Sequence, residues 1–224
     1  MARMARVVIP GWPHHVTQRG NRRQQTFFDD SDYRYYIALM TEWGPKLGVE
    51  FWAYTLMPNH VHHVAIPHEE GALAACIGEI HPRYSRHINF REGWRGYLWQ
   101  GRFFSTPMDE SYLLAATRYI ELNPVRARLV TRPEDWLYSS ALAHLGLRED
   151  RAITMQPLCS MVNDWNELLR SDKHDLQRNE NIRRATRTGR PLAPVARIEQ
   201  WERQLGRRLQ PQKPGRKPKR SPKK

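Results

Sequence analysis

Residues 49–66 read VEFWAYTLMPNHVHHVAI, and this stretch predicts a β-hairpin. Val49 to Leu56 has the alternation and the aromatic and β-branched composition of a strand, and His60 to Ile66 has those of a second. The intervening Pro58-Asn59 pair is typical of a turn. The hairpin therefore places a cluster of histidines at the start of its second strand.

Two of these histidines, His60 and His62, are separated by one apolar residue. Alternate side chains of a strand point to the same face, so the two imidazoles are expected side by side. Val61 then packs into the core, and His63 points away from the pair. A histidine pair on a strand is often structural, but this spacing also suits two metal ligands.

A second motif, Tyr119-Ile120-Glu121-Leu122-Asn123, ends a helix predicted from Asp109 or Ser111 to Asn123. Tyr119 and Asn123 are four residues apart and share one face of such a helix. If the strand and the helix meet, His60, His62 and Asn123 are three candidate metal ligands around one phenol. The pattern predicts a metal-assisted tyrosine nucleophile.

The chemistry follows from the residue types. A divalent cation held by His60, His62 and Asn123 would polarise a phosphodiester oxygen. A tyrosine phenol has an ordinary pKa of about 10, so Tyr119 needs the cation or a nearby base to attack. Imidazoles favour transition metals, whereas an amide oxygen and a phosphate suit Mg²⁺ or Mn²⁺, so the residues alone leave the metal open.

Structural explanations compete with these assignments. Asn123 could cap the helix end before Pro124. Tyr119 could be an ordinary half-buried helix tyrosine. Other tyrosines then remain alternative nucleophiles: Tyr35, Tyr36, Tyr84 and Tyr112.

The elements around the hairpin predict an α+β fold in the order β-α-β-β-α-β-α. The first six have the order of the ferredoxin-like split βαβ unit, and the closing helix carries Tyr119. Outside the hairpin, the predicted elements are extended segments at 6–9 and 14–18, helices at 29–47 and 69–90, a strand at 97–105 and the helix ending at 123.

The C-terminal part reads as helical pieces at 136–147, 157–169, 172–188 and 194–209. We expect a catalytic domain over residues 1–150, a helical extension over 151–188 and a basic, flexible tail over 189–224. The chain has a formal net charge of +13, and residues 183–224 hold 15 Lys or Arg against 2 acidic residues. The entire excess lies in this segment, which predicts contact with a polyanion, including through Arg216 and Lys217.

Composition bounds the class of protein. The 224 residues are 40% hydrophobic, without a run long enough for a transmembrane helix or a signal peptide. The two cysteines, Cys76 and Cys159, show no metal-site spacing. We expect a cytoplasmic, nucleoid-associated protein without disulfides and without a membrane partner.

The ordered motifs resemble those of the REP-associated tyrosine transposases, a branch of the single-tyrosine HUH transposases related to insertion-sequence transposases. The resemblance covers roughly residues 7–147. It rests on these stretches: His15-Val16-Thr17-Gln18-Arg19-Gly20-Asn21-Arg22-Arg23, Phe28-Asp29-Asp30, Met57-Pro58-Asn59-His60-Val61-His62, Trp99-Gln100-Gly101-Arg102-Phe103, Arg118-Tyr119-Ile120-Glu121-Leu122-Asn123-Pro124-Val125-Arg126-Ala127 and Trp136-Leu137-Tyr138-Ser139-Ser140.

The resemblance implies cleavage and rejoining of single-stranded DNA at REP-like palindromic hairpins. It implies metal ligation by His60, His62 and Asn123, a 5′-phosphotyrosine on Tyr119, and Mg²⁺ or Mn²⁺ as the metal. The sequence departs from the family pattern at His63, Glu121 and Arg128. These departures bear on substrate contact and local turns more than on the chemistry.

A basic loop and a later arginine are candidate DNA contacts because they combine amide and guanidinium donors. A solvated loop is the competing explanation. Other functions also remain open: a domesticated hairpin-binding protein without mobilising activity, or a metal-dependent nuclease or RNA binder without covalent catalysis. One tyrosine per chain is compatible with a monomer or a homodimer. The candidate contacts are Gln18, Arg19, Asn21, Arg22, Arg23 and Arg102.

Overall fold

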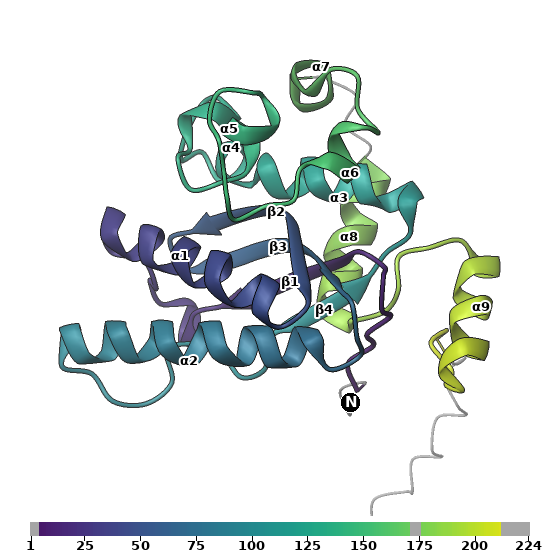
Figure 1. Ribbon diagram of the computed structural model, residues 1–224, viewed down its shortest axis with the longest axis horizontal. Coiled ribbons are helices and arrows are strands. Elements are labelled where there is room, and N and C mark those ends of the chain that lie inside the picture. Colours follow the sequence, from purple (N-terminus) through teal and green to yellow (C-terminus); the bar gives the residue numbers. More distant parts are fainter. Residues whose placement is uncertain (1–4, 171–175, 212–224) are drawn as a thin grey trace, which may run out of the picture.

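The protein is built on a four-stranded antiparallel sheet with helices on both faces (Figure 1). The computed structural model describes residues 5–170 and 176–211. The strands lie in the order β2-β3-β1-β4, and β1-α1-β2-β3-α2-β4 is the element order expected from the sequence. The strands are β1 (His14–Arg19), β2 (Val49–Met57), β3 (His60–Pro67) and β4 (Phe104–Pro107).

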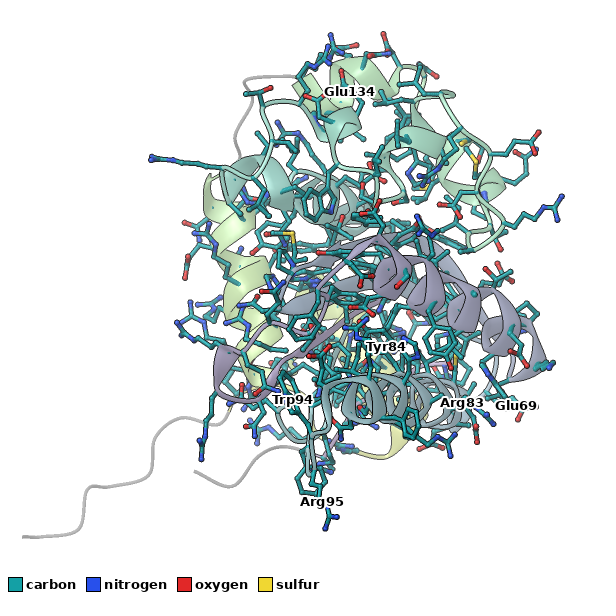
Figure 2. The ribbon with its side chains drawn as sticks, turned by 90° about the vertical axis from the view of Figure 1, so that its left-hand side faces the viewer. Glu69, Arg83, Tyr84, Trp94, Arg95 and Glu134 are labelled. Carbon is teal, nitrogen blue, oxygen red and sulfur yellow. The ribbon has the colours of Figure 1, made fainter. Side chains whose placement is uncertain are left out.

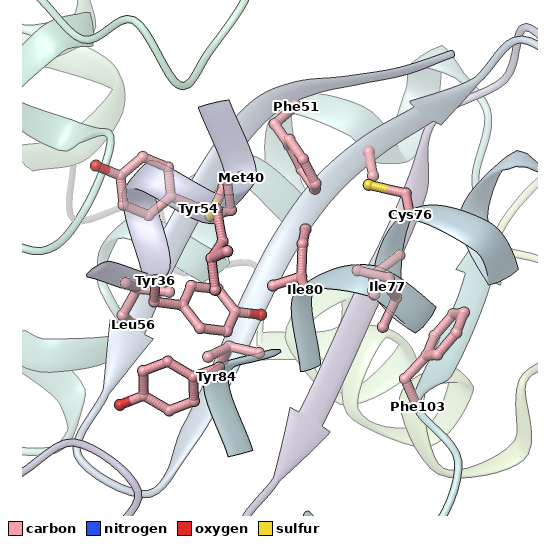
Figure 3. Close-up of a cluster of buried hydrophobic side chains, with 14 of the residues drawn as sticks. Tyr36, Met40, Phe51, Tyr54, Leu56, Cys76, Ile77, Ile80, Tyr84 and Phe103 are labelled. Atoms are coloured by element: carbon pink, nitrogen blue, oxygen red, sulfur yellow. The ribbon is translucent and has the colours of Figure 1, made fainter. Parts of the chain in front are cut away.

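One face of the sheet is covered by α1 (Asp30–Lys46) and α2 (Ala72–Glu92). Figure 3 shows the apolar core between these helices and the sheet, with Tyr36 and Met40 from α1 and Ile80 from α2. The N-terminus of α1 is capped by the Asp29 carboxylate, which accepts hydrogen bonds from two backbone N–H groups of the first turn. This layer is the larger apolar core.

The other face is covered by α3 (Glu110–Glu121) and α8 (Leu176–Thr188). Val64 and Ala53 of the sheet pack there with Leu113 of α3 and Ile182 of α8. The helix with the candidate nucleophile therefore lies on the face opposite α1 and α2.

The strand register decides which side chains share the α3 face. Thr17 pairs with His62 and Arg19 pairs with His60 across β1 and β3. Paired residues of an antiparallel ladder point to the same side. His15, two residues before Thr17, therefore lies on this side as well.

Several predicted boundaries differ in the structure. The strand expected at 97–105 begins only at Phe104, because the preceding segment turns at Gly96 and Gly101, both at positive φ. The extended segment at 6–9 is not a strand. The expected helices at 136–147 and 157–169 are short pieces, namely α5 (Ala141–His144), α6 (Gln156–Cys159) and α7 (Trp165–Arg170), with a 3₁₀ turn before them at Pro133–Asp135.

The C-terminal segment is folded beyond residue 189, where the basic tail was expected to begin. It contains α9 (Val195–Leu205), and Trp201 and Leu209 are buried against Val7 and Ile9. The helix α9 agrees with the helix expected at 194–209, and the flexibility expected of residues 189–224 stays a prediction. The domain division itself stays a prediction, and Arg216 and Lys217 lie outside the described residues.

Within the described part of the chain, none of the helices combines the length and the apolar character needed to span a membrane.

Candidate functional site

The predicted nucleophile and the histidine pair meet on the α3 face of the sheet. The ring centroids of His62 and Tyr119 are 6.3 Å apart, and those of His60 and His62 are 5.0 Å apart. His15 of β1 joins them, with its ring 6.2 Å from Tyr119 and 5.1 Å from His62. Four side chains from three elements thus form one cluster.

Hydrogen bonds fix one nitrogen of each candidate ligand. His60 Nδ1 lies 2.6 Å from the Asn59 side-chain oxygen, and His62 Nδ1 lies 2.8 Å from His15 Nε2. Among the described residues, no group hydrogen-bonds the Nε2 atom of either ligand candidate. An imidazole that donates through Nδ1 presents its Nε2 lone pair, which is the form that binds a metal.

A chain of hydrogen bonds extends from His62 into α8. His15 Nδ1 lies 3.3 Å from Thr186 Oγ1, and this hydroxyl donates to the Ile182 carbonyl at 2.8 Å. Because that carbonyl only accepts, the hydroxyl oxygen is left to accept from His15 Nδ1–H. His15 Nε2 is then the acceptor for His62 Nδ1–H, so the chain fixes both tautomers in one direction.

Burial keeps these imidazoles neutral. It lowers the pKa of His15 and of His60 to about 3, with smaller contributions from the positive charges of Arg126 and Arg19 respectively. Burial also lowers the pKa of His62 well below its usual value, and the neighbouring His60 and His15 act in the same direction. Neutral imidazole is the ligand form.

Asn123 lies beside a break in the predicted helix. The helix ends at Leu122, and Asn123 begins the short helix α4 (Asn123–Arg126). Its side chain caps neither helix, and its Nδ2 atom is buried with no hydrogen-bond partner. The capping explanation therefore fails, and the role of Asn123 as a metal ligand through its amide oxygen stays a prediction.

No group of three or more His, Cys, Asp or Glu side chains within residues 5–170 and 176–211 is arranged to hold a metal ion. The candidate set is instead two imidazoles and one amide. It leaves coordination positions for substrate oxygens, as a catalytic metal site requires.

Two arginines adjoin the phenol. The Arg126 guanidinium lies 4.0 Å from the centroid of the Tyr119 ring and donates to the Tyr119 carbonyl at 2.6 Å. Burial lowers the pKa of Arg126 to about 10, which still leaves it a cation at neutral pH. Arg19 is exposed at the end of β1, opposite His60 in the register.

The remaining predicted DNA contacts are divided between surfaces. Gln18 is buried on the α2 side of the sheet, where its Nε2 donates to the Gly101 carbonyl at 3.0 Å. Asn21, Arg22 and Arg23 form a 3₁₀ turn after β1, and both arginines are exposed. Arg102 is exposed in the loop before β4.

The three departures from the family pattern have different surroundings. His63 points to the α1 side and contacts Tyr36. Glu121 is buried, and its Oε1 accepts from Ser140 and His144, each at 2.5 Å. Arg128 has φ 58°, a left-handed conformation in which glycine is favoured.

The sequence analysis gave no role to His15, Arg126 or Thr186. Alternation along residues 14–19 places His15 on one face with Thr17 and Arg19, but that alternation does not reveal which strand lies alongside. Arg126 lies seven residues after Tyr119, across a helix break that was not predicted. Thr186 lies 124 positions from His62 and carries no local signal.

Comparisons with known proteins identify the family and the fold. The family model described as "Transposase IS200 like" matches residues 11–123. A solved structure of a REP-associated tyrosine transposase bound to a REP hairpin is 21% identical, with a TM-score of 0.56 over 67% of this chain and 90% of that chain. This likeness shows a shared fold.

A candidate transposase from Deinococcus radiodurans is 20% identical over 54% of this chain and 96% of that chain, with a TM-score of 0.38, too low to support an argument. A comparison with curated proteins gives no significant match. The family match spans more than half of the chain and includes the histidine pair, Tyr119 and Asn123. The protein therefore belongs to the IS200-like transposase family.

Proposed function

We propose that this protein is a metal-dependent transposase that cleaves and rejoins single-stranded DNA through a covalent bond to Tyr119. The observation that carries the proposal is the meeting of Tyr119 with two imidazoles whose Nε2 atoms are free. Here the arrangement leaves reactive atoms on one side of the sheet.

In the proposed step, the Tyr119 oxygen attacks a DNA phosphorus and forms a 5′-phosphotyrosine. The bond from phosphorus to the 3′ oxygen breaks, the phenol loses its proton, and the departing oxygen gains one to become a 3′-hydroxyl. The Arg126 cation over the phenol ring stabilises negative charge on it. Because the phosphoester bond is conserved in the protein link, a 3′-hydroxyl can reverse the step without ATP.

His60, His62 and Asn123 are the residues that would hold Mg²⁺ or Mn²⁺. When bound, such a cation would supply Lewis-acid polarisation of the scissile phosphate. His15 is not itself a candidate metal ligand. The hydrogen bond that its Nε2 accepts from His62 Nδ1 holds the His62 ring and leaves Nε2 of His62 free. Such supporting hydrogen bonds orient a ligand imidazole and raise its basicity.

The substrate we infer is single-stranded DNA carrying REP-like hairpins. Support comes from family membership, from the hairpin-bound protein of shared fold, and from the net charge of +13. Arg19, Arg22 and Arg23 form an exposed cationic edge beside His60 that suits a phosphate backbone. Either a monomer acting twice or a homodimer is compatible with one Tyr119 per chain.

The test is covalent-adduct formation with a labelled hairpin oligonucleotide from host intergenic repeats. The wild-type protein should give a protein-linked band on a denaturing gel with Mn²⁺ or Mg²⁺, and EDTA should remove it. Tyr119→Phe should abolish the band. The matched control is Tyr112→Phe, because Tyr112 lies on the same helix and is also partly buried.

The outcomes separate the candidate functions. Cleavage that survives Tyr119→Phe would reject the nucleophile and indicate a hydrolytic nuclease. Tight binding without any adduct, with both metals and several repeats, would indicate a hairpin-binding protein without this chemistry.

A further inference from the structure

A cleft lies on the α2 side of the sheet, away from Tyr119. Its volume is about 810 Å³, and it is formed by the C-terminal half of α2 and the segment 93–101 that follows. Figure 2 shows Trp94 and Arg95 at this end of the molecule, with Arg95 directed away from the body of the protein. The site described above uses none of its side chains.

The cleft presents aromatic rings to solvent. Phe90 and Tyr97 are each 89% exposed, and Trp94 is 42% exposed. Leaving large apolar surface in water is unfavourable, and clustered exposed aromatics indicate a binding surface. Two arginines of the lining, Arg86 and Arg95, are exposed and form no ion pair with any residue of the described ranges.

Two polar atoms of the cleft lining are buried without hydrogen-bond partners. They are Oε1 of Gln18 and Nε1 of Trp99, whose residues are 2% and 6% exposed. The orientation of the Gln18 amide is determined, since the Gly101 carbonyl accepts and therefore requires Nε2. The lining thus offers one unsatisfied acceptor and one unsatisfied donor, each costly unless a ligand completes it.

The cleft is joined directly to the basic turn that leads to the catalytic face. The Asn21 N–H donates to the Leu98 carbonyl and the Gln100 N–H to the Arg19 carbonyl, each at 2.8 Å. Gln18 faces the cleft, and the next residue, Arg19, faces the side of His60. A single strand could therefore pass over the end of β1 from one side of the sheet to the other.

We propose that this cleft binds an unpaired nucleobase of the single-stranded DNA next to the hairpin. The proposal rests on the proposed function, since it assigns a further subsite for the same substrate. A base supplies a flat face for Tyr97, Phe90 or Trp94, and its edge supplies a donor for Gln18 and an acceptor for Trp99. Every unpaired base carries such a donor and acceptor side by side on its Watson–Crick edge, thymine through N3–H and O4, so these two atoms suit a base edge without selecting one base.

The test measures equilibrium binding by the full-length chain carrying Tyr119→Phe, which prevents covalent reaction. The probes are a hairpin with an unpaired flank and the same DNA with abasic sites placed one at a time in the flank. One abasic position should weaken binding by about 5- to 100-fold, the range for losing one base-stacking contact. Adding Phe90→Ala and Tyr97→Ala should weaken binding to the intact flank similarly, but should have little further effect on the DNA with that abasic site.

The control is Leu147→Ala, an exposed apolar residue outside the cleft, which should leave both affinities unchanged. A second measurement tests the polar contact. Gln18→Met should weaken binding to the intact flank and should have little further effect on the DNA with the sensitive abasic site. The two aromatic side chains are highly exposed, so their removal should leave the fold intact.

Equal losses on intact and abasic DNA would overturn the proposal, as would no loss. If Phe90 and Tyr97 instead bind an apolar peptide, their removal should cause no loss of DNA binding. Failure of the proposed function is seen separately: if wild-type protein forms no adduct while the base-dependent coupling is present, the cleft assignment stands and the chemistry fails. If the protein binds no single-stranded DNA at all, both fail.

Discussion

Each face of the sheet buries one histidine of β3, and the two histidines differ in their hydrogen-bond partners. On the α3 face, His62 gives Nδ1 to His15 and keeps Nε2 free. On the α1 and α2 face, His63 Nε2 contacts the Tyr36 hydroxyl at 3.2 Å, and that hydroxyl also lies 3.0 Å from His81 Nε2. The first chain leaves Nε2 of His62 without a partner, whereas the second joins three buried side chains within the core, where Nδ1 of His63 has no partner.

The difference follows from what packs on each face. Tyr36 is fully buried, and His81 stacks on Trp99 with ring centroids 4.8 Å apart, so the His63 side is filled with aromatic rings. On the Tyr119 side, α3 ends shortly after the tyrosine, and Arg126 of α4 lies over the phenol ring. Of these two neighbouring histidines of β3, His63 is thus a structural group and His62 is a candidate metal ligand.

The sharpest way to break this comparison is to remove each histidine in turn. His62→Ala should lower the rate of adduct formation by more than about 100-fold, since losing a ligand exceeds the 10- to 100-fold cost of losing a supporting partner. His63→Ala should retain adduct formation but lower the free energy of unfolding by about 1–3 kcal/mol, because it leaves the Tyr36 hydroxyl with one partner fewer and a void. Gel assays and urea titrations give both quantities, and the reverse pattern would exchange the two roles.

The hydrogen-bond chain can be cut further from the site. Thr186→Val removes the acceptor of His15 and should weaken Mn²⁺ binding about 10-fold, the lower end of the range for supporting partners. Thr188→Val is the matched control on the same helix, where the hydroxyl bonds only to backbone groups. Thr186→Ser should restore affinity, and equal Mn²⁺ affinity in Thr186→Val and wild type, measured by electron paramagnetic resonance, would reject a positioning role.

The cation over the phenol has a counterpart on the other face. Arg126→Gln should slow adduct formation about 2- to 5-fold, the equivalent of 0.5–1 kcal/mol for a cation–π contact. Arg83 lies 4.3 Å from the Trp43 ring centroid, so Arg83→Gln removes a similar contact far from the chemistry and should leave the rate unchanged. Equal rates in both variants would show that Arg126 has no influence on the nucleophile.

The core face also makes a prediction about the pH dependence of stability. Burial lowers the pKa of His81 from 6.5 to about 3, so between these pH values the unfolded chain binds a proton that folded His81 does not. Stability is therefore full above pH 6.5 and falls as the pH decreases toward 3, by up to about 1.4 kcal/mol per pH unit for this group.

Urea midpoints from about pH 7.5 to about 4.5 measure this slope. His81→Leu should flatten it by up to one proton, whatever the change in stability at neutral pH that follows from the lost Tyr36 contact. His63, Tyr36 and Trp99 surround His81, and they are unchanged in this variant. An unchanged slope would mean that His81 is protonated in the folded protein.

The sequence by itself determined the hairpin, the order of the first six elements and the opposite directions of His62 and His63. These are local properties, because strand alternation and turn chemistry act over a few residues. The motifs also indicated His60, His62, Tyr119 and Asn123. The structure brings His60, His62 and Tyr119 together on one face of the sheet, and Asn123 begins the next helix. Their roles in metal binding and catalysis stay predictions.

Only the tertiary structure decided that His15 bonds His62, that Thr186 orients His15, and that Arg126 lies over Tyr119. It also buried Gln18, expected as a DNA contact, and packed Trp201 of the expected tail against the N-terminal segment. Each depends on strand register or on contact between distant segments. Side-chain patterns report the face of an element, but not which other element covers that face.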